Sequence, residues 1–183
     1  PDAERPAAAP PDELLQRLRR FHDDYFPGVA DHFQDLVRDG QHPTILFIGC
    51  SDSRIVPYLL TGTGPGELFI IRNVGAFVPP YDGSAGYHGT AAAIEFAVLN
   101  LKVARIVVCG HTHCGGIRAL YEDPPAQAVN LKAWLELGRE AFTRLLGQAQ
   151  AADLGVSLAN IPLNLKHPDL DLGQISQAVQ KST

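Results

Sequence analysis

The 183-residue chain has few cysteines, no basic cluster and no long apolar run. Its three cysteines are an odd number, and a chain of this length can bury a hydrophobic core without disulfide cross-links. Both observations argue against a disulfide scaffold. Fifteen Lys and Arg residues are outnumbered by twenty Asp and Glu residues, so nucleic acid is not expected as a partner. No apolar run reaches about 18 residues without a charge, Gly or Pro, so we expect no membrane span.

The chain does have the composition of one globular domain, with 45% apolar and 19% charged residues. We expect a flexible Pro- and Ala-rich lead-in at residues 1–11 and a single domain over 12–183. Asp12 can cap a helix that runs through Phe21, and a second helix is predicted over 29–38. Because both precede the first strand, we expect this helical arm (12–40) to pack on the side of the domain or on another subunit.

Three short apolar runs, at 44–49, 67–72 and 104–109, have the continuous β-branched character of buried parallel strands. The Ala-rich stretch 89–101 between the last two predicts a helix with one broad buried face. This order of elements predicts an α/β fold, with a parallel-sheet core flanked by helices. Further helices are predicted at 117–121 and 131–148, with a short one near the end of the chain.

Chemically versatile residues follow two of the predicted strands. Cys50 ends the first strand, and His111 and Cys114 follow the third. If those strands are neighbours, their carboxyl ends bring the three side chains together at the edge where open α/β sheets bind ligands. Two thiolates and one imidazole suit zinc and leave a fourth position open. Asp52 can be a fourth ligand or accept a hydrogen bond from metal-bound water, and Arg54 can hold it off the metal.

Each of these residues alone also has an ordinary structural explanation. A cysteine at a strand end is usually core, and an Asp-x-Arg pair is usually solvated. Cys109 lies inside a strand and is expected to be core, and His113 is expected to point away from the ligands. Residues 62–66 lack the spacing of a phosphate-binding loop, and neither Ser51 nor Ser53 has the context of a nucleophile elbow.

Taken together, several segments resemble the β-class carbonic anhydrases, particularly the bacterial and cyanobacterial members. The resemblance is strong over residues 40–121, looser before them and weak after Trp134. The segments that carry it are Cys50–Arg54, Arg72–Gly75, Gly89–Thr90 with Ala93–Val98, and Gly110–Gly116.

The resemblance implies zinc bound by Cys50, His111 and Cys114, and catalytic roles for Asp52 and Arg54. It also implies an inactive state in which Asp52 is the fourth zinc ligand. Members with that state carry a Trp in a bicarbonate pocket. The single Trp of this chain lies outside the resembling region, so we expect the open state, with Asp52 paired to Arg54.

The resemblance further implies residues that bind substrate. Gln41 matches a glutamine that reaches the site of a neighbouring subunit. Phe69, Val74 and Phe96 match apolar walls of the CO2 pocket, and Phe96 stands where some members have Tyr. The backbone amide of Gly115 matches a donor to bicarbonate.

The expected activity is therefore reversible hydration of CO2 to bicarbonate and a proton, by hydroxide generated at zinc, with rates that rise toward alkaline pH. The alternatives are hydrolysis of COS or CS2 on the same scaffold, and a noncatalytic zinc-bearing assembly subunit. The last would predict a lost ligand or a lost Asp–Arg pair, whereas all five residues are present.

The resemblance also implies a homodimer with swapped N-terminal helices, or a larger oligomer of such dimers. Zinc thiolates favour a reducing compartment, so we expect a cytoplasmic protein, with the periplasm and the carboxysome as alternatives. After a zinc-binding core (41–121), we expect a mainly helical part (122–183). The last strand of the family, with its His-Gly-Trp-like start, is expected to be absent, because the sequence reaches Thr183 without it.

Overall fold

The computed structural model describes residues 11–146 and 158–162. The chain divides into two compact units, Pro1–Gln41 and His42–Thr183. Both predicted helices of the arm are present in the first unit, and Gln41 falls with them although the sequence grouped it with the core. The elements of this unit are α1 (Pro11–Arg20), the π-helical turn η1 (Phe21–Tyr25), η2 (Phe26–Gly28) and α2 (Ala30–Asp39).

Helix α1 has an exposed apolar face. Leu14 is 62% exposed, Leu18 is 57% exposed and Phe21 follows one turn later at 45%. Spacings of three and four residues place these side chains on one side of a helix. Acidic residues in the first turn and basic residues in the last turn favour the helix through its dipole. Local sequence therefore accounts for the helix, while its apolar face stays open to solvent.

The second unit is built on a four-stranded sheet of order β2-β1-β3-β4. β1 pairs in parallel with both β2 and β3, which confirms the three predicted strands to within a residue. β4 pairs antiparallel with β3 and was not predicted from the sequence. β4 is short and ends in a proline, which has no N–H to donate and therefore suits an edge strand. The bounds are β1 (Ile45–Cys50), β2 (Leu68–Asn73), β3 (Arg105–Cys109) and β4 (Leu158–Pro162).

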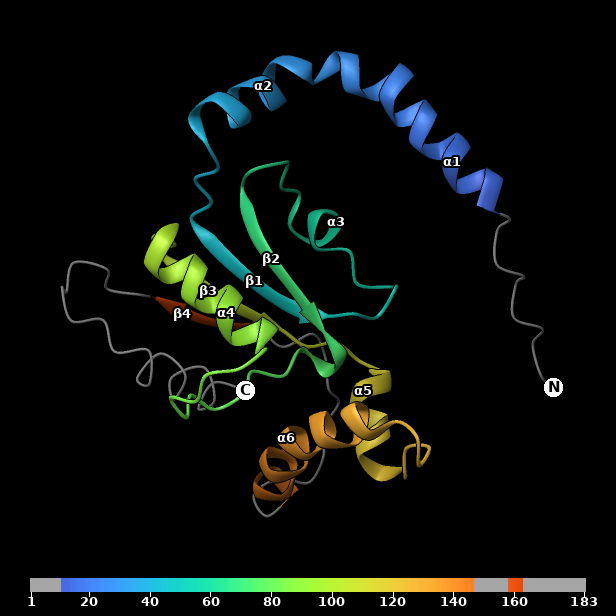
Figure 1. The fold of residues 1–183 in the computed structure, drawn as a ribbon, viewed down its shortest axis with the longest axis vertical. Helices are drawn as coiled ribbons and strands as arrows, with labels where there is room; N and C mark the ends of the chain where they lie inside the picture. The colour runs from blue at the N-terminus through green and yellow to red at the C-terminus, as the bar shows by residue number, and fades with distance from the viewer. Residues whose placement is uncertain (1–10, 147–157, 163–183) are drawn as a thin grey trace. The chain divides into compact units, whose positions relative to one another are not determined.

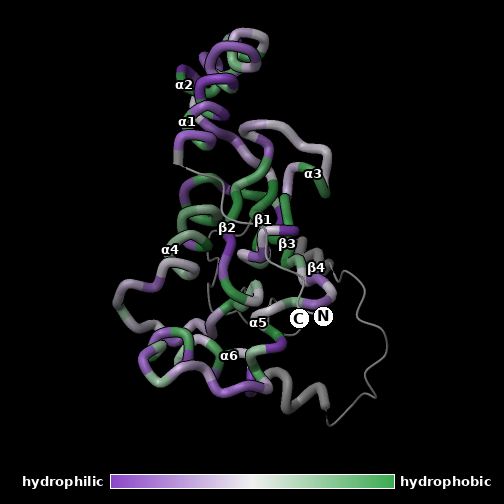
Figure 2. Tube along the Cα trace, turned by 90° about the vertical axis from the view of Figure 1, so that its right-hand side faces the viewer, coloured by the Kyte–Doolittle hydropathy of each residue, from purple (hydrophilic) through white to green (hydrophobic). Residues whose placement is uncertain are grey.

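Apolar side chains are buried on both faces of this sheet. On one face, Leu46 and Ile48 of β1 pack with Ile106 and with Val98 of the helical layer. On the other face, Phe47 packs in a cluster with Leu68 and Cys109, so Cys109 is core, as predicted. Because alternate residues point to opposite faces, burial on both faces explains why the strands are continuously apolar. Figure 2 shows β2 changing from hydrophobic to hydrophilic at its carboxyl end.

Helices connect and cover the strands (Figure 1). The predicted helix over 89–101 is present as α4 followed by a π-helical turn, η4. α3 was not predicted from the sequence. α5 and α6 lie beyond the carboxyl ends of β1 and β2 in Figure 1. None of the described helices is long and apolar enough to cross a membrane. The bounds are α3 (Pro57–Thr61), α4 (Gly89–Glu95), η4 (Phe96–Asn100), α5 (Gly115–Arg118) and α6 (Val129–Leu146).

Candidate metal centre

The register of the sheet brings two sequence segments to one edge. Gly49 pairs with Cys109, so β1 and β3 end side by side, as the prediction required. Cys50 is the last residue of β1, and the loop after β3 carries His111 before Cys114 caps α5. The carboxyl edge of an open α/β sheet is the usual place for a ligand site. The fold therefore joins residues that lie about sixty positions apart.

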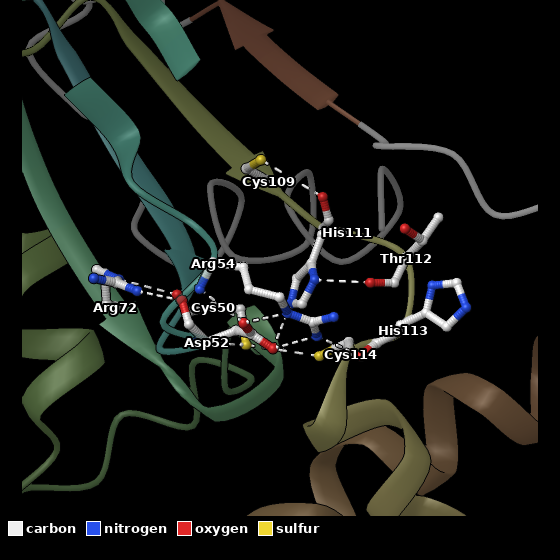
Figure 3. Close-up of polar contacts among 10 residues, drawn as sticks. Cys50, Asp52, Arg54, Arg72, Cys109, His111, Thr112, His113 and Cys114 are labelled. Carbon is white, nitrogen blue, oxygen red and sulfur yellow. Dashed lines mark hydrogen bonds and ion pairs between the residues drawn. The ribbon is translucent and has the colours of Figure 1, made fainter. Parts of the chain in front are cut away.

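Cys50, His111 and Cys114 form a compact set of potential ligands (Figure 3). One ligand atom from each lies within 4.8 Å of the other two. The two sulfurs are 3.6 Å apart. Sulfurs bound at about 2.3 Å to one tetrahedral zinc ion are separated by about 3.8 Å, so the pair has nearly the required spacing. Both cysteines are buried, and the His111 side chain is only 5% exposed.

The orientation of His111 also suits metal binding. Its Nδ1 lies 3.0 Å from the carbonyl oxygen of Thr112. Because a carbonyl only accepts, Nδ1 donates the proton and Nε2 keeps a free lone pair. This Nε2 is buried and has no hydrogen-bond partner among the described residues. An unsatisfied buried nitrogen is costly, whereas an imidazole fixed through its other nitrogen is the usual form of a metal ligand.

The two thiols share an environment that a cation would change. Burial raises the pKa of the Cys114 thiol, and the neighbouring Cys50 raises it further. Backbone N–H groups of Ile117 and Gly116 act in the opposite direction. A divalent cation would favour both thiolates, since a coordinating thiol loses its proton. Two sulfurs and one imidazole nitrogen match zinc and do not match magnesium or calcium, which prefer oxygen ligands.

Asp52 and Arg54 form a two-point ion pair beside these ligands. Arg54 Nε donates to Asp52 Oδ1 at 2.9 Å, and Nη2 donates to Oδ2 at 2.7 Å. These bonds hold the pKa of the Asp52 carboxyl well below its usual range. Asp52 Oδ2 lies 3.9 Å from His111 Nε2, and the Asp52 side chain is 15% exposed. The carboxylate is thus ionised, paired and close to the three ligands.

Arg54 also connects the two loops that carry the ligands. Its Nη2 donates to the carbonyl oxygen of His113 at 2.8 Å. His113 has a φ of 55°, in the left-handed region that side chains disfavour. Figure 3 shows its ring pointing away from Cys50 and Cys114, in agreement with the prediction. His113 contributes its backbone, a role that side-chain chemistry did not reveal.

Like the backbone contact at His113, the contacts of Arg72 were not predicted from the sequence. Its Nε donates to the carbonyl of Cys50 at 3.0 Å, and its Nη2 donates to the carbonyl of Asp52 at 2.6 Å. The Asp52 amide in turn lies 3.4 Å from the Cys50 sulfur, to which it donates. Arg72 was noticed as part of a motif, but its partners are backbone atoms and leave no signal in the sequence.

Val74 lies beside the first turn of α5. A Cβ added to Gly116 would lie 2.8 Å from the Gly75 nitrogen and 3.0 Å from Val74 Cγ1. Trp134 Nε1 donates to the Val74 carbonyl at 2.8 Å, a contact that the sequence did not indicate. Val74 and Trp134 both line an open cleft of about 560 Å³. The structure thus places Val74 next to the helix that Cys114 and Gly115 begin.

Comparison with known proteins identifies the family. The family model described as carbonic anhydrase matches residues 45–167, which include all three candidate ligands. The solved structure of the β-carbonic anhydrase CcaA superposes with a TM-score of 0.68 at 38% identity, covering 75% of this chain and 61% of that one. The chain belongs to the β-class carbonic anhydrases.

Two further comparisons define the extent of the similarity. A carbonic anhydrase of Synechococcus elongatus is 47% identical over 108 residues, which are 59% of this chain and 39% of that protein. Structures of two tetrameric β-carbonic anhydrases from Sordaria macrospora give a TM-score of 0.54 at 34% identity, covering 75% of this chain and 64% of the other. The matched part spans less than half the length of the curated relatives.

Not every pocket residue implied by the β-carbonic anhydrase resemblance lies near the ligands. Phe69 and Phe96 stack on each other with ring centroids 5.7 Å apart, and Phe96 is 44% exposed. Phe69 pairs with Leu46, four residues before the pairing of Asn73 with Cys50. At about 3.3 Å per residue, this places Phe69 about 13 Å back along the sheet. Gln41 lies in the first unit.

Proposed function

We propose that this chain catalyses the reversible hydration of CO2 to bicarbonate and a proton, with zinc held by Cys50, His111 and Cys114. The observation that carries the proposal is the His111 Nε2 atom, buried without a hydrogen-bond partner among the described residues and grouped with two thiols at zinc-compatible spacing. Membership of the β-carbonic anhydrase family supports the same reaction.

Zinc would supply hydroxide at neutral pH, because coordination lowers the pKa of water from 15.7 to about 7. The role of Asp52 follows from its position and charge. Its carboxylate can accept a hydrogen bond from the attacking oxygen and so orient the oxygen lone pair toward CO2. Arg54 keeps that carboxylate ionised and fixes both of its oxygens. We therefore assign Asp52 to orientation of the nucleophile and Arg54 to control of Asp52.

The substrate would be held by an apolar wall and a polar donor. Val74 is 39% exposed beside α5 and can offer CO2 an apolar surface. The amide of Gly115, at the start of α5, would donate to a bicarbonate oxygen. Because Phe69 stands about 13 Å back from the ligands of its own chain, we infer that Phe69 and Phe96 serve the site of another copy. Gln41 would likewise act on a neighbouring site.

This arrangement requires more than one copy of the chain. The exposed apolar face of α1 supports a homodimer, or an oligomer of dimers, in which the arm packs on a partner. The Sordaria macrospora proteins are described as tetrameric. We place the protein in the cytoplasm, because a reducing compartment preserves the two thiolates. The curated relatives are carbonic anhydrases, which favours CO2 hydration over hydrolysis of COS or CS2 and over a noncatalytic role.

Stopped-flow CO2 hydration by the full chain tests this function. The zinc-loaded protein should hydrate CO2, lose the rate after chelation and regain it when zinc is restored. COS hydrolysis is measured on the same preparation to separate the two substrates. A zinc-loaded protein with no CO2 hydration above the buffer rate would refute the proposal.

A further inference from the structure

The segment between Cys50 and Arg54 carries the reactive side chains but has little regular structure. β1 ends at Cys50, and the next amide, that of Ser51, still donates to Asn73 of β2 at 2.8 Å. Beyond Ser51 the chain leaves the sheet, so ladder hydrogen bonds no longer fix its backbone. Other contacts must hold Asp52 in place.

One side chain spans this segment. Arg72 is opposite Gly49 in the register of β2 with β1, so its guanidinium starts next to the end of β1. It donates to the carbonyls of Cys50 and Asp52, the two residues that flank Ser51. A guanidinium is planar and presents its donors at a fixed separation, so the two bonds orient the peptide groups on either side of the Ser51–Asp52 peptide. The Asp52 carbonyl also accepts from the Ile55 amide at 2.9 Å. Bonds from a cationic donor are also shorter and stronger than neutral ones.

The Ser51–Asp52 peptide, which lies between these two carbonyls, connects two parts of the candidate metal centre. The Asp52 amide donates to the Cys50 sulfur, and the Asp52 side chain is directed toward His111. Figure 3 shows Arg72 approaching this segment from the side opposite His111 and His113. A rotation of the Ser51–Asp52 peptide would therefore alter the hydrogen bond to the sulfur and the position of the carboxylate together.

We propose that Arg72 is a positioning residue that, through the carbonyls on either side, sets the Ser51–Asp52 peptide, and with it both the Asp52 carboxylate and the hydrogen bond on the Cys50 sulfur. This role rests on the proposed function for its effect on rate, but its effect on the ligand sulfur does not depend on catalysis. Arg72 acts entirely through backbone carbonyls. A lysine could donate to one of the two carbonyls, whereas a neutral glutamine lacks both the positive charge and the two-donor geometry of the guanidinium.

The test compares Arg72→Gln, Arg72→Lys and wild type, with Arg118→Gln as the matched control. Arg118 is an exposed arginine of α5 that pairs with Glu122. Each protein is loaded with zinc for kinetics and with cobalt(II) for visible absorption, which reports the ligand field of the thiolates. We expect Arg72→Gln to bind one metal ion per chain and to lose about 10- to 100-fold in kcat, because misplacement by about 1 Å costs that much.

KM should change less than about threefold, since Arg72 does not touch substrate in this scheme. The cobalt(II) bands should shift in Arg72→Gln, move back toward wild type in Arg72→Lys and stay unchanged in Arg118→Gln. An unshifted spectrum with full kcat in Arg72→Gln overturns the positioning role. Loss of metal binding in both Arg72 variants overturns it as well, because it would show a general structural role. If wild type itself has no hydration rate, the proposed function fails, and the cobalt spectra still decide the role of Arg72.

Discussion

The carboxyl edge of the sheet is held by polar contacts within one chain, whereas helix α1 forms from its local sequence and leaves its apolar face exposed. At the sheet edge, polar contacts from one chain fix the candidate ligands: Arg72 holds the Cys50–Asp52 segment, and Arg54 joins it to His113. In α1, the helix forms locally but its apolar face is exposed. The difference teaches that the candidate ligands come together within one chain, whereas the proposed substrate pocket would draw residues from a second copy.

The largest effect is expected from Cys50→Ala, which removes one of the three candidate ligands. Zinc content and CO2 hydration should both fall to background, as measured by metal analysis and stopped flow. Cys109→Ala is the matched control, because Cys109 is equally buried but lies in the core. It should keep its zinc. Full zinc binding by Cys50→Ala would show that the sheet edge is not the metal centre.

Asp52→Asn should separate the rate from the metal. The amide has the shape of the carboxylate but lacks its charge, so kcat should fall about 100-fold while zinc content stays near one ion per chain. Asp82→Asn, at an exposed aspartate bonded to Ser84, should have wild-type kinetics. Equal rates in the two variants would contradict the role given to Asp52.

Leu18→Asp tests whether the apolar face of helix α1 packs on a second copy of the chain. If the α1 face is buried against a second copy, loss of one buried leucine should weaken self-association by roughly 10- to 100-fold, from about 1.5–3 kcal/mol of burial. Light scattering after size-exclusion chromatography measures the change. Gln16→Asp places the same charge at a polar position of α1 and should not alter assembly. An unchanged oligomer in Leu18→Asp would remove the proposed role of the arm.

Gly116→Ala tests how tightly the sheet edge is packed. The added methyl would meet the Gly75 backbone at 2.8 Å, so we expect a loss of about 1–3 kcal/mol in the free energy of unfolding, measured with urea. Gly89→Ala serves as the control, because a Cβ there meets nothing within 4 Å. Equal stability of the two variants would mean that α5 can move away from Val74.

The smallest effect concerns the pH dependence of stability. Arg54 lowers the pKa of Asp52 in the folded protein, so the pair stabilises the fold above the unfolded pKa of about 3.9. The contribution is lost as pH falls through the lower folded value. The difference in urea midpoint between wild type and Arg54→Gln should therefore be constant from about pH 8 to 5 and shrink below about pH 4. A difference independent of pH would assign it to the hydrogen bond with His113 instead.

The sequence was sufficient to predict the three parallel strands and to group the three candidate ligands. Runs such as 45–50 are apolar on both faces because both faces are buried. This pattern can be recognised in the sequence alone. Cys50 and His111 could be grouped because parallel strands end at a common edge. These predictions rest on regular geometry, which follows from local sequence.

Contacts to backbone atoms could not be predicted in the same way. The partners of Arg72 and Trp134 are carbonyl oxygens, which every residue has, so no residue type identifies them. β4 was missed because five residues ending in Pro162 give little periodicity. The position of Phe69 depended on strand register, which places it far from its own Cys50 although the sequence places both in the same core.

The hydrogen bond from Arg54 to His113 affects how the two loops at the candidate metal centre open locally. It joins segments 59 residues apart, one after β1 and one after β3. Opening either loop breaks the same guanidinium contacts, so the two loops should open together as one cooperative unit. In hydrogen exchange, amides of both loops would then share a single opening free energy. A substitution that loosens the loop after β1 would also loosen the loop that carries His111 and Cys114.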